Sequence, residues 1–123
     1  MIHYLKRHHS YMWRYMSRLI AHLFKRPIFP FLMGTSLTLI TLFSCLIYFI
    51  EGGVNPLVQN MGDAIYFSIA LLTTVGLGDV HPVTTLGKVV TSFMMLLGAF
   101  LFVSFTGVIS SSLHEIEREI DQD

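Results

Sequence analysis

Residues 73–79 read TTVGLGD, and their types and spacing limit the chemistry that this stretch can offer. No lysine follows the glycines, as a phosphate-binding loop requires, and no nucleophile stands at a turn apex. Gly76 and Gly78 alternate with apolar residues, and glycine readily adopts positive φ. This alternation lets successive carbonyls point the same way while the side chains point back into protein. Aligned carbonyls, together with the Thr74 hydroxyl, form a set of hard oxygen ligands for a dehydrated monovalent cation.

The composition indicates the class of protein that must hold such a stretch. Of 123 residues, 53% are hydrophobic and only 13% are charged, whereas soluble domains carry about 25% charged residues. We therefore expect a membrane protein with one domain. The single cysteine, Cys45, excludes an intrachain disulfide and is interpreted as an apolar helix residue. No nucleophile–base pair or metal-ligand cluster is visible, so we expect no enzyme, no cofactor and no nucleic-acid partner.

Two uncharged stretches have the length needed to cross a bilayer. They are residues 28–50 and 89–109, and a spanning helix needs about 20 apolar residues. We place an outer helix at about 30–50 and an inner helix at about 87–110. The first stretch does not read as a signal peptide, because its basic leader and its apolar run are both too long. Pro27 and Pro30 suit its first turn.

Basic residues predict the orientation in the membrane. Only Lys88 lies between the two stretches or at their edge, whereas the residues before the first stretch include Lys6, Arg7, Arg14, Arg18, Lys25 and Arg26. The positive-inside rule then places the N-terminus in the cytoplasm, and two spans return the C-terminus there. We expect an integral protein of the plasma (inner) membrane.

The connection between the spans predicts a re-entrant loop. Glu51, Asn55 and their glycine and proline neighbours read as turn formers. Asp63 reads as an N-cap, and an unbroken apolar run follows, which predicts a helix over about 63–73. Such a helix is about 15 Å long, half the thickness of a bilayer. Irregular backbone after it, at membrane depth, must be buried in protein or line a water-filled path.

The segments outside the spans are also patterned. Placed on a helix, residues 5–25 gather basic side chains on one stripe and apolar ones opposite, which predicts an interfacial amphipathic helix on anionic lipid head groups over 1–27. The alternative is a disordered basic leader. The acidic tail over 113–123 has Leu113, Ile116 and Ile120 on one stripe, so it either continues the second span as a helix or frays in solvent.

With these elements in place, the chain resembles the two-transmembrane potassium channel pore module. The motif is similar to the signature T-V-G-Y-G-D, with Leu77 where tyrosine is usual, and the similarity covers about residues 28–112, the predicted pore domain. The resemblance implies an all-α membrane protein that acts as a homotetramer. It also implies that K⁺ binds in a filter over 74–78, through the carbonyls of Thr74, Val75, Gly76 and Leu77 and the Thr74 hydroxyl, with Gly78 closing the outer end.

The resemblance implies further roles around the filter. Asp79 would lie behind the filter mouth, with Tyr66 as its nearest hydroxyl partner. Gly98 would be the gating hinge of the inner helix, the alternative being close helix packing. One face of that helix would line the pore, through Phe102, Thr106, Ser110 and His114. For Phe102 the alternative is contact with lipid or core.

Departures from the family pattern leave alternatives open. Leu77 removes the tyrosine hydroxyl and ring that brace many filters, and no acid near the end of the half-length helix can pair with Asp79. We expect a potassium-selective channel; the alternatives are a weakly selective monovalent cation channel or a non-conducting accessory subunit. Arginine does not recur at every third position of an apolar helix, so we expect no voltage sensor of that kind. A longer native protein that continues beyond residue 123 stays open.

A pH-sensitive gate is one further expectation. His114 stands beside Glu115, Glu117 and Glu119, and histidine titrates near neutral pH. Four copies at an inner mouth would repel one another when protonated. The alternative is a solvated histidine without a role.

Overall fold

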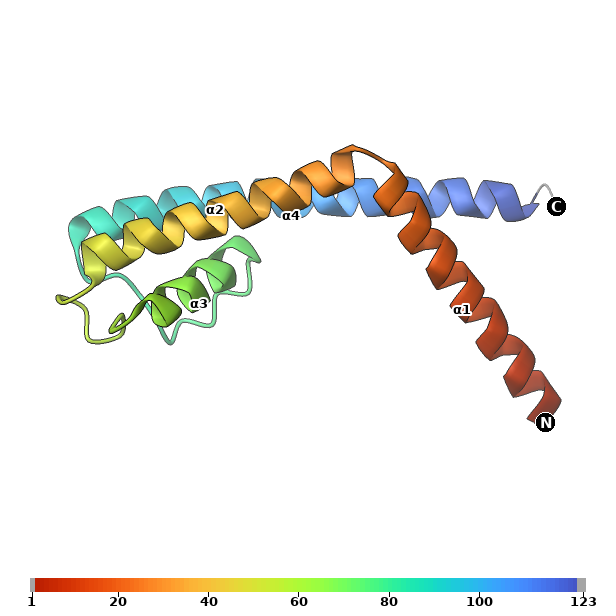
Figure 1. Ribbon diagram of the computed structural model, residues 1–123, viewed down its shortest axis with the longest axis horizontal. Coiled ribbons are helices and arrows are strands. Elements are labelled where there is room, and N and C mark those ends of the chain that lie inside the picture. Colours follow the sequence, from red (N-terminus) through yellow and green to blue (C-terminus); the bar gives the residue numbers. More distant parts are fainter. Residues whose placement is uncertain (1, 122–123) are drawn as a thin grey trace. The chain divides into compact units, whose positions relative to one another are not determined.

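Four helices make up the regular structure of the residues described. The computed structural model describes the backbone of residues 2–121 and the side chains of residues 13 and 15–118. The helices are α1 (Ile2–Lys25), α2 (Ile28–Glu51), α3 (Met61–Leu72) and α4 (Thr85–Asp121), shown in Figure 1. No strand occurs within residues 2–121, and the predicted all-α fold is confirmed.

Helices α2 and α4 are long and apolar enough to cross a membrane, and α3 is apolar but shorter. α2 begins two residues earlier than expected. Pro27 can stand just before its first turn, because the N–H groups at a helix start have no hydrogen-bond acceptor within the helix and the missing N–H of proline costs no bond. α4 begins at Thr85 and continues to Asp121 without a break. For residues 113–123, the sequence left open either a helix that continues the second span or an end that frays in solvent. The structure shows the helix as far as Asp121. Ile116, on the predicted apolar stripe, is fully buried.

The start of α3 corrects one prediction. Asn60, not Asp63, is the N-cap: its side chain accepts a hydrogen bond from the Asp63 N–H at 3.1 Å. The Asp63 carboxylate in turn accepts from the Asn60 N–H at 3.1 Å. Asp63 is thus the third residue of a capping box, and two donors at the helix start are satisfied reciprocally.

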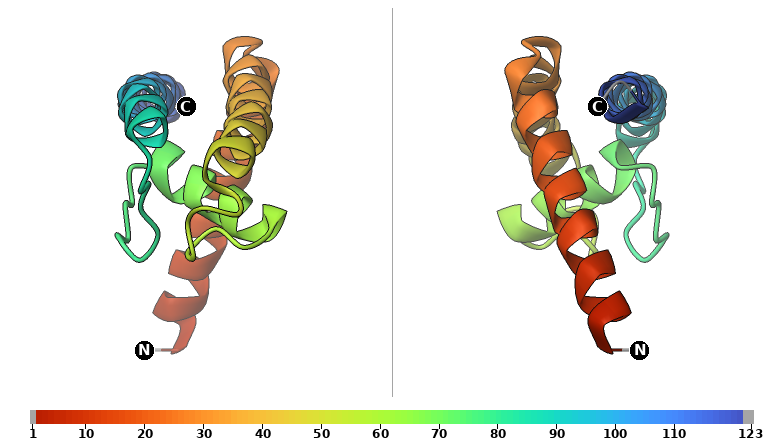
Figure 2. Two further views of the ribbon diagram at one scale, coloured as in Figure 1. Left: turned by 90° about the vertical axis from the view of Figure 1, so that its left-hand side faces the viewer. Right: turned by 90° about the vertical axis from the view of Figure 1, so that its right-hand side faces the viewer.

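The chain divides into two compact units, one of which comprises residues 32–104. Within it, α3 lies on one side of the pair formed by α2 and α4 (Figures 1 and 2). The apolar core of this unit draws on all three helices and includes Phe43, Ile47, Phe67, Leu71, Met94 and Leu101. Half-length α3 is therefore held against the two long helices by apolar packing.

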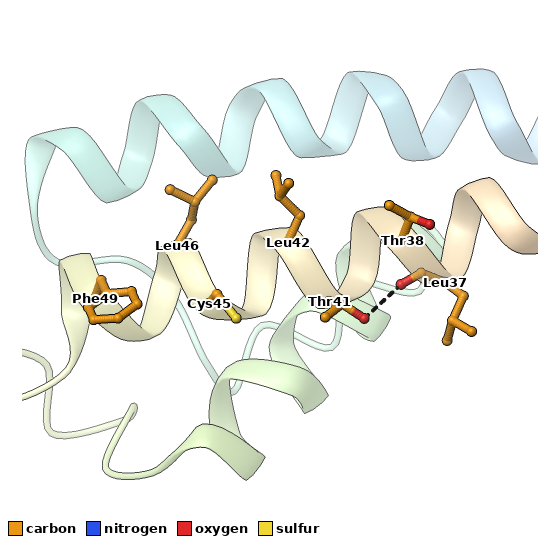
Figure 3. A pocket seen from close by; sticks show the side chains of 7 residues that line it. All are labelled: Leu37, Thr38, Thr41, Leu42, Cys45, Leu46 and Phe49. Atoms are coloured by element: carbon orange, nitrogen blue, oxygen red, sulfur yellow. Dashed lines mark hydrogen bonds between the residues drawn. The ribbon is translucent and has the colours of Figure 1, made fainter.

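One side of α2, away from its buried residues, is apolar and exposed. Figure 3 shows the side chains that form a shallow groove there, of about 670 Å³: Leu37, Thr38, Thr41, Leu42, Cys45, Leu46 and Phe49. The Thr38 and Thr41 hydroxyls donate to the carbonyls four residues earlier, at 2.9 Å. Because its hydroxyls are satisfied within the helix, this surface suits contact with lipid tails.

The other unit comprises residues 1–31 and 105–123. Arg26, in the short connection between α1 and α2, forms an ion pair with Glu115 and donates to the Ser111 hydroxyl at 3.4 Å. Phe29 packs edge-on against Phe24 and Phe105, with ring centroids 5.4 and 5.9 Å apart. These contacts join the start of the first span to the C-terminal half of α4.

Candidate functional site

The backbone of residues 74–78 alternates between two conformations. Thr74, Gly76 and Gly78 have φ of +61°, +52° and +78°, whereas Val75 and Leu77 do not have positive φ. Glycine adopts positive φ without cost, but a β-branched threonine there is a strained outlier. A backbone whose φ changes sign at each residue cannot form a helix. From this alternation we infer that successive carbonyls point to the same side of the segment.

Hydrogen bonds fix this segment to the end of α3. The Thr74 N–H donates to the Leu71 carbonyl and the Gly76 N–H to the Ala70 carbonyl, both at 3.0 Å. Thr73, the C-cap, donates from its hydroxyl to the Ile69 carbonyl at 2.7 Å. These carbonyls belong to the last turn of a helix, where they lack partners within the helix. The helix end therefore sets where the segment starts.

Tyr66 and Asp79 form a hydrogen bond across the segment. The Tyr66 hydroxyl donates to Asp79 Oδ2 at 2.7 Å, and the Val80 N–H donates to Oδ1 at 3.0 Å. The bond to Asp79 raises the pKa of the Tyr66 hydroxyl, and lost hydration and the charge of Asp79 add to this. Since tyrosine ordinarily titrates near pH 10, the hydroxyl stays protonated and able to donate at neutral pH.

Glu51 holds the loop that follows residues 74–78. This role of Glu51 was not predicted. Its side chain is buried and accepts four hydrogen bonds: from Thr84 Oγ1 at 2.6 Å, Asn55 Nδ2 at 2.8 Å, the Val83 N–H at 2.9 Å and the Thr84 N–H at 3.0 Å. Asn55 also donates to the His81 carbonyl at 2.7 Å. Four donors and no acceptor around one carboxyl group favour its ionised form.

This network adds to the reading of Glu51 and Asn55 as turn formers. Asn55 does form a turn, since its Oδ1 accepts a hydrogen bond from the Leu57 N–H at 2.9 Å. Glu51 is the last residue of α2, and Asn55 is buried. The available signal was an isolated acid at the end of an otherwise uncharged apolar stretch, since such an acid needs hydrogen-bond partners.

A pocket of about 150 Å³ lies behind the segment. Gly76, Leu77, Gly78, Asp79 and Thr91 are among the residues that line it. The Thr91 hydroxyl is buried there, and neither it nor the Ser68 hydroxyl has a hydrogen-bond partner among the described residues. Leu77 thus borders the same space as the unpartnered Thr91 hydroxyl.

Gly98 and the predicted pore-lining residues all lie on α4. Gly98 is buried against the end of α3: a Cβ built on it would lie 2.8 Å from the Leu72 carbonyl oxygen. In contrast, Phe102, Thr106, Ser110 and His114 are exposed in the single chain. His114 lies 3.5 Å from a Glu117 carboxylate oxygen. The roles of these residues stay predictions.

Two spanning helices around a half-length helix and a segment of alternating backbone define a membrane pore module. A family model described as "Ion channel" matches residues 35–115, so the chain belongs to this ion channel family. The resemblance to a potassium channel pore module is confirmed. The family is one of channels rather than of enzymes, and with its two apolar helices the chain is an integral membrane protein.

Individual relatives are similar over part of the chain. A hyperpolarization-activated voltage-gated potassium channel of Methanocaldococcus jannaschii is 47% identical over 62 residues, which is 50% of this chain and 30% of that protein. The voltage-gated potassium channel Kch of Escherichia coli is 31% identical over 77 residues, 63% of this chain and 18% of that one. The chain thus spans less than a third of either relative.

A solved structure shares the fold over most of its length. It is the crystal structure of a voltage-gated K⁺ channel pore module in a closed state in lipid membranes. The TM-score is 0.56 at 32% identity, and the match covers 75% of this chain and 92% of that one.

Proposed function

We propose that this chain is one subunit of a homotetrameric channel that conducts K⁺ selectively and passively across a membrane. The observation that carries this proposal is the alternating backbone at Thr74, Gly76 and Gly78, directly after half-length α3 and between two spanning helices. The similarity to proteins named as potassium channels supports it.

The proposed ligands are oxygens of the chain itself. The carbonyls of Thr74, Val75, Gly76 and Leu77, with the Thr74 hydroxyl, replace the hydration shell of K⁺, and Gly78 closes the outer end. One chain supplies one strand of ligands, so enclosing the ion requires several copies around an axis. The side chains of Val75 and Leu77 are 62% and 61% exposed in the single chain, as expected of residues that neighbouring copies cover.

Leu77 bears on selectivity rather than on conduction. Its backbone ligand is unchanged, and the hydrogen bond from Tyr66 to Asp79 braces the filter mouth without a tyrosine at position 77. We therefore favour a K⁺-selective pore over the weakly selective alternative.

The proposed orientation places both termini in the cytoplasm, with the channel in the plasma membrane, because the basic residues precede α2. Only two residues separate α1 from α2, so α1 stays close to the membrane surface. Trp13, Met16, Ile20 and Phe24 are exposed at helical spacing, and Arg18 and Lys25 are exposed on another side of the helix. We assign the apolar side chains to the lipid interface and the basic side chains to anionic head groups.

Ion flux into liposomes tests this function. Purified tetramer is expected to pass K⁺ and Rb⁺ and to exclude Na⁺. Gly76→Ala should abolish flux, because alanine is strained at the φ of +52° that Gly76 adopts, whereas Gly34→Ala, in open space within α2, should not. Equal Na⁺ flux would favour the weakly selective pore, and absent flux from a well-folded tetramer would favour an accessory subunit.

A further inference from the structure

We propose that Gly98 is a positioning residue for the ion filter, acting through the end of α3, in addition to any part it has in bending α4. The inference rests on the proposed function, since it concerns the filter that residues 74–78 would form. It requires only that position 98 carries no side chain, whatever the flexibility of glycine contributes.

The contact between Gly98 and α3 leaves no room for a side chain. Gly98 is buried, and a Cβ on it would lie 2.8 Å from the Leu72 carbonyl oxygen, 3.0 Å from the Leu71 carbonyl oxygen and 3.0 Å from Leu72 Cα. All three atoms belong to the backbone, so a change of side-chain rotamer cannot relieve the clash. Either α3 or α4 would have to move.

These backbone atoms belong to the residues that anchor the filter. Leu72 ends α3, and the Leu71 carbonyl accepts the hydrogen bond from the Thr74 N–H. The Ala70 carbonyl, one residue earlier, accepts from the Gly76 N–H. A shift of the helix end therefore moves the acceptors that hold Thr74 and Gly76 in place. Ligand geometry in a preorganised site does not tolerate displacements of about 1 Å.

A second glycine of α4 provides a matched control. Around Gly107, no atom lies within 4 Å of a built Cβ. Alanine at either position strengthens the helix and reduces its freedom to bend. The two substitutions thus share their effect on helix flexibility, and only the one at Gly98 introduces a clash with α3.

The experiment compares wild type, Gly98→Ala and Gly107→Ala as purified tetramers. The readouts are K⁺ affinity by calorimetry, with the flux ratio of K⁺ to Na⁺ measured in parallel. We expect Gly98→Ala to weaken K⁺ binding at least about tenfold and to lower the flux ratio. Gly107→Ala should keep K⁺ affinity within about twofold of wild type, whatever its effect on opening.

Mixed tetramers cover the case in which Gly98→Ala does not assemble by itself. A tagged Gly98→Ala subunit is co-expressed with excess wild-type subunits, and tagged tetramers are isolated. Reduced K⁺ affinity in these tetramers supports the proposal. Wild-type K⁺ affinity in Gly98→Ala tetramers, pure or mixed, overturns it, even if flux falls. Absence of K⁺ binding and flux in the wild type instead contradicts the proposed function.

Discussion

Tyr66 and Asp79 show how two side chains can brace the mouth of the proposed filter. Leu77 has no hydroxyl, but the Tyr66 hydroxyl reaches Asp79 Oδ2 at 2.7 Å from the middle of α3. A hydrogen bond from a neutral hydroxyl to a carboxylate is stronger than one between neutral groups. The bond therefore ties α3 to the residue that follows the proposed filter.

Tyr66→Phe tests this brace. The substitution removes the hydroxyl and keeps the ring, so Asp79 Oδ2 loses its donor while Oδ1 keeps the Val80 N–H. We expect sustained K⁺ flux in liposomes to fall several-fold without loss of tetramer, because the filter mouth loses its connection to α3.

Tyr48→Phe serves as the control for this substitution, since the Tyr48 hydroxyl makes no hydrogen bond within the described part of the chain and should leave flux unchanged. If Tyr66→Phe conducts as well and as selectively as wild type, the brace is dispensable and the role assigned to Tyr66 is wrong.

Predictions about single residues were correct where the two interacting residues lie close together in the sequence. Tyr66 was named as a partner of Asp79 because it carries the nearest hydroxyl that could reach it, and the hydrogen bond is present. The network of Glu51 was missed because two of its donors are the backbone N–H groups of Val83 and Thr84. Every residue except proline carries such a group, so side-chain types do not reveal the pairing.

At the scale of elements, Glu51 is what joins the end of α2 to the start of α4. Its two carboxylate oxygens share four donors from three residues: Asn55, Val83 and Thr84. A Cβ on Gly87, in the first turn of α4, would overlap the same carboxylate. The connection between the proposed filter and the second span is therefore fixed by one buried anion.

Glu51→Gln should destabilise the tetramer. With its NH₂ towards Thr84, glutamine keeps the bonds from Asn55 and Val83 and can donate to the Thr84 hydroxyl, but the Thr84 N–H loses its acceptor. At about 1–3 kcal/mol for an unsatisfied buried donor, we expect a loss of about 1–3 kcal/mol per subunit. A lower midpoint temperature for tetramer dissociation would show it.

Glu117→Gln is the matched control, because the Glu117 side chain is 63% exposed and its pairing with His114 is a surface contact. An exposed pair of this kind contributes little to stability. Equal midpoints for Glu51→Gln and wild type would mean that the buried network does not stabilise the assembly.

The sequence predicts that the helices exist more reliably than it predicts where each one begins and ends. Apolar runs of bilayer length and of half that length predicted α2, α4 and α3, because hydrophobic length is a direct requirement of the membrane. The first turn of α3 was misplaced, since Asn60 and Asp63 are both good capping residues and the capping box uses both. The continuation of α4 through residues 113–121 rests on packing of residues such as Ile116, which the short apolar stripe alone could not decide.

At the scale of the whole molecule, the exposed apolar surface is what the membrane and the proposed tetramer account for. Exposed apolar residues lie on α1, on the outer side of α2 and on α4. In a soluble monomer such patches would favour aggregation. The proposed tetramer and the lipid around it cover these surfaces.

The lipid contact of α1 can be followed through Trp13, the only tryptophan of the chain, which is 75% exposed. We expect brominated lipids to quench its fluorescence, and more so in bilayers that contain anionic lipid, because basic side chains favour the charged surface. The double variant Arg18→Gln, Lys25→Gln should reduce the dependence on anionic lipid.

Lys88→Gln is the control here, because Lys88 is an exposed basic residue at the start of the second span and outside α1. Trp13 fluorescence that brominated lipids leave unquenched would show that α1 does not lie on the bilayer.

The central claim is that four copies of residues 74–78 select K⁺. The most direct measurement is the reversal potential of purified tetramer in a planar bilayer, with K⁺ on both sides at unequal concentration and Na⁺ balancing the dilute side. We predict a reversal potential close to the equilibrium potential of K⁺, because the carbonyl ligands replace its hydration shell. Channel currents that reverse near zero would show a pore that does not distinguish the two ions, and would contradict the account.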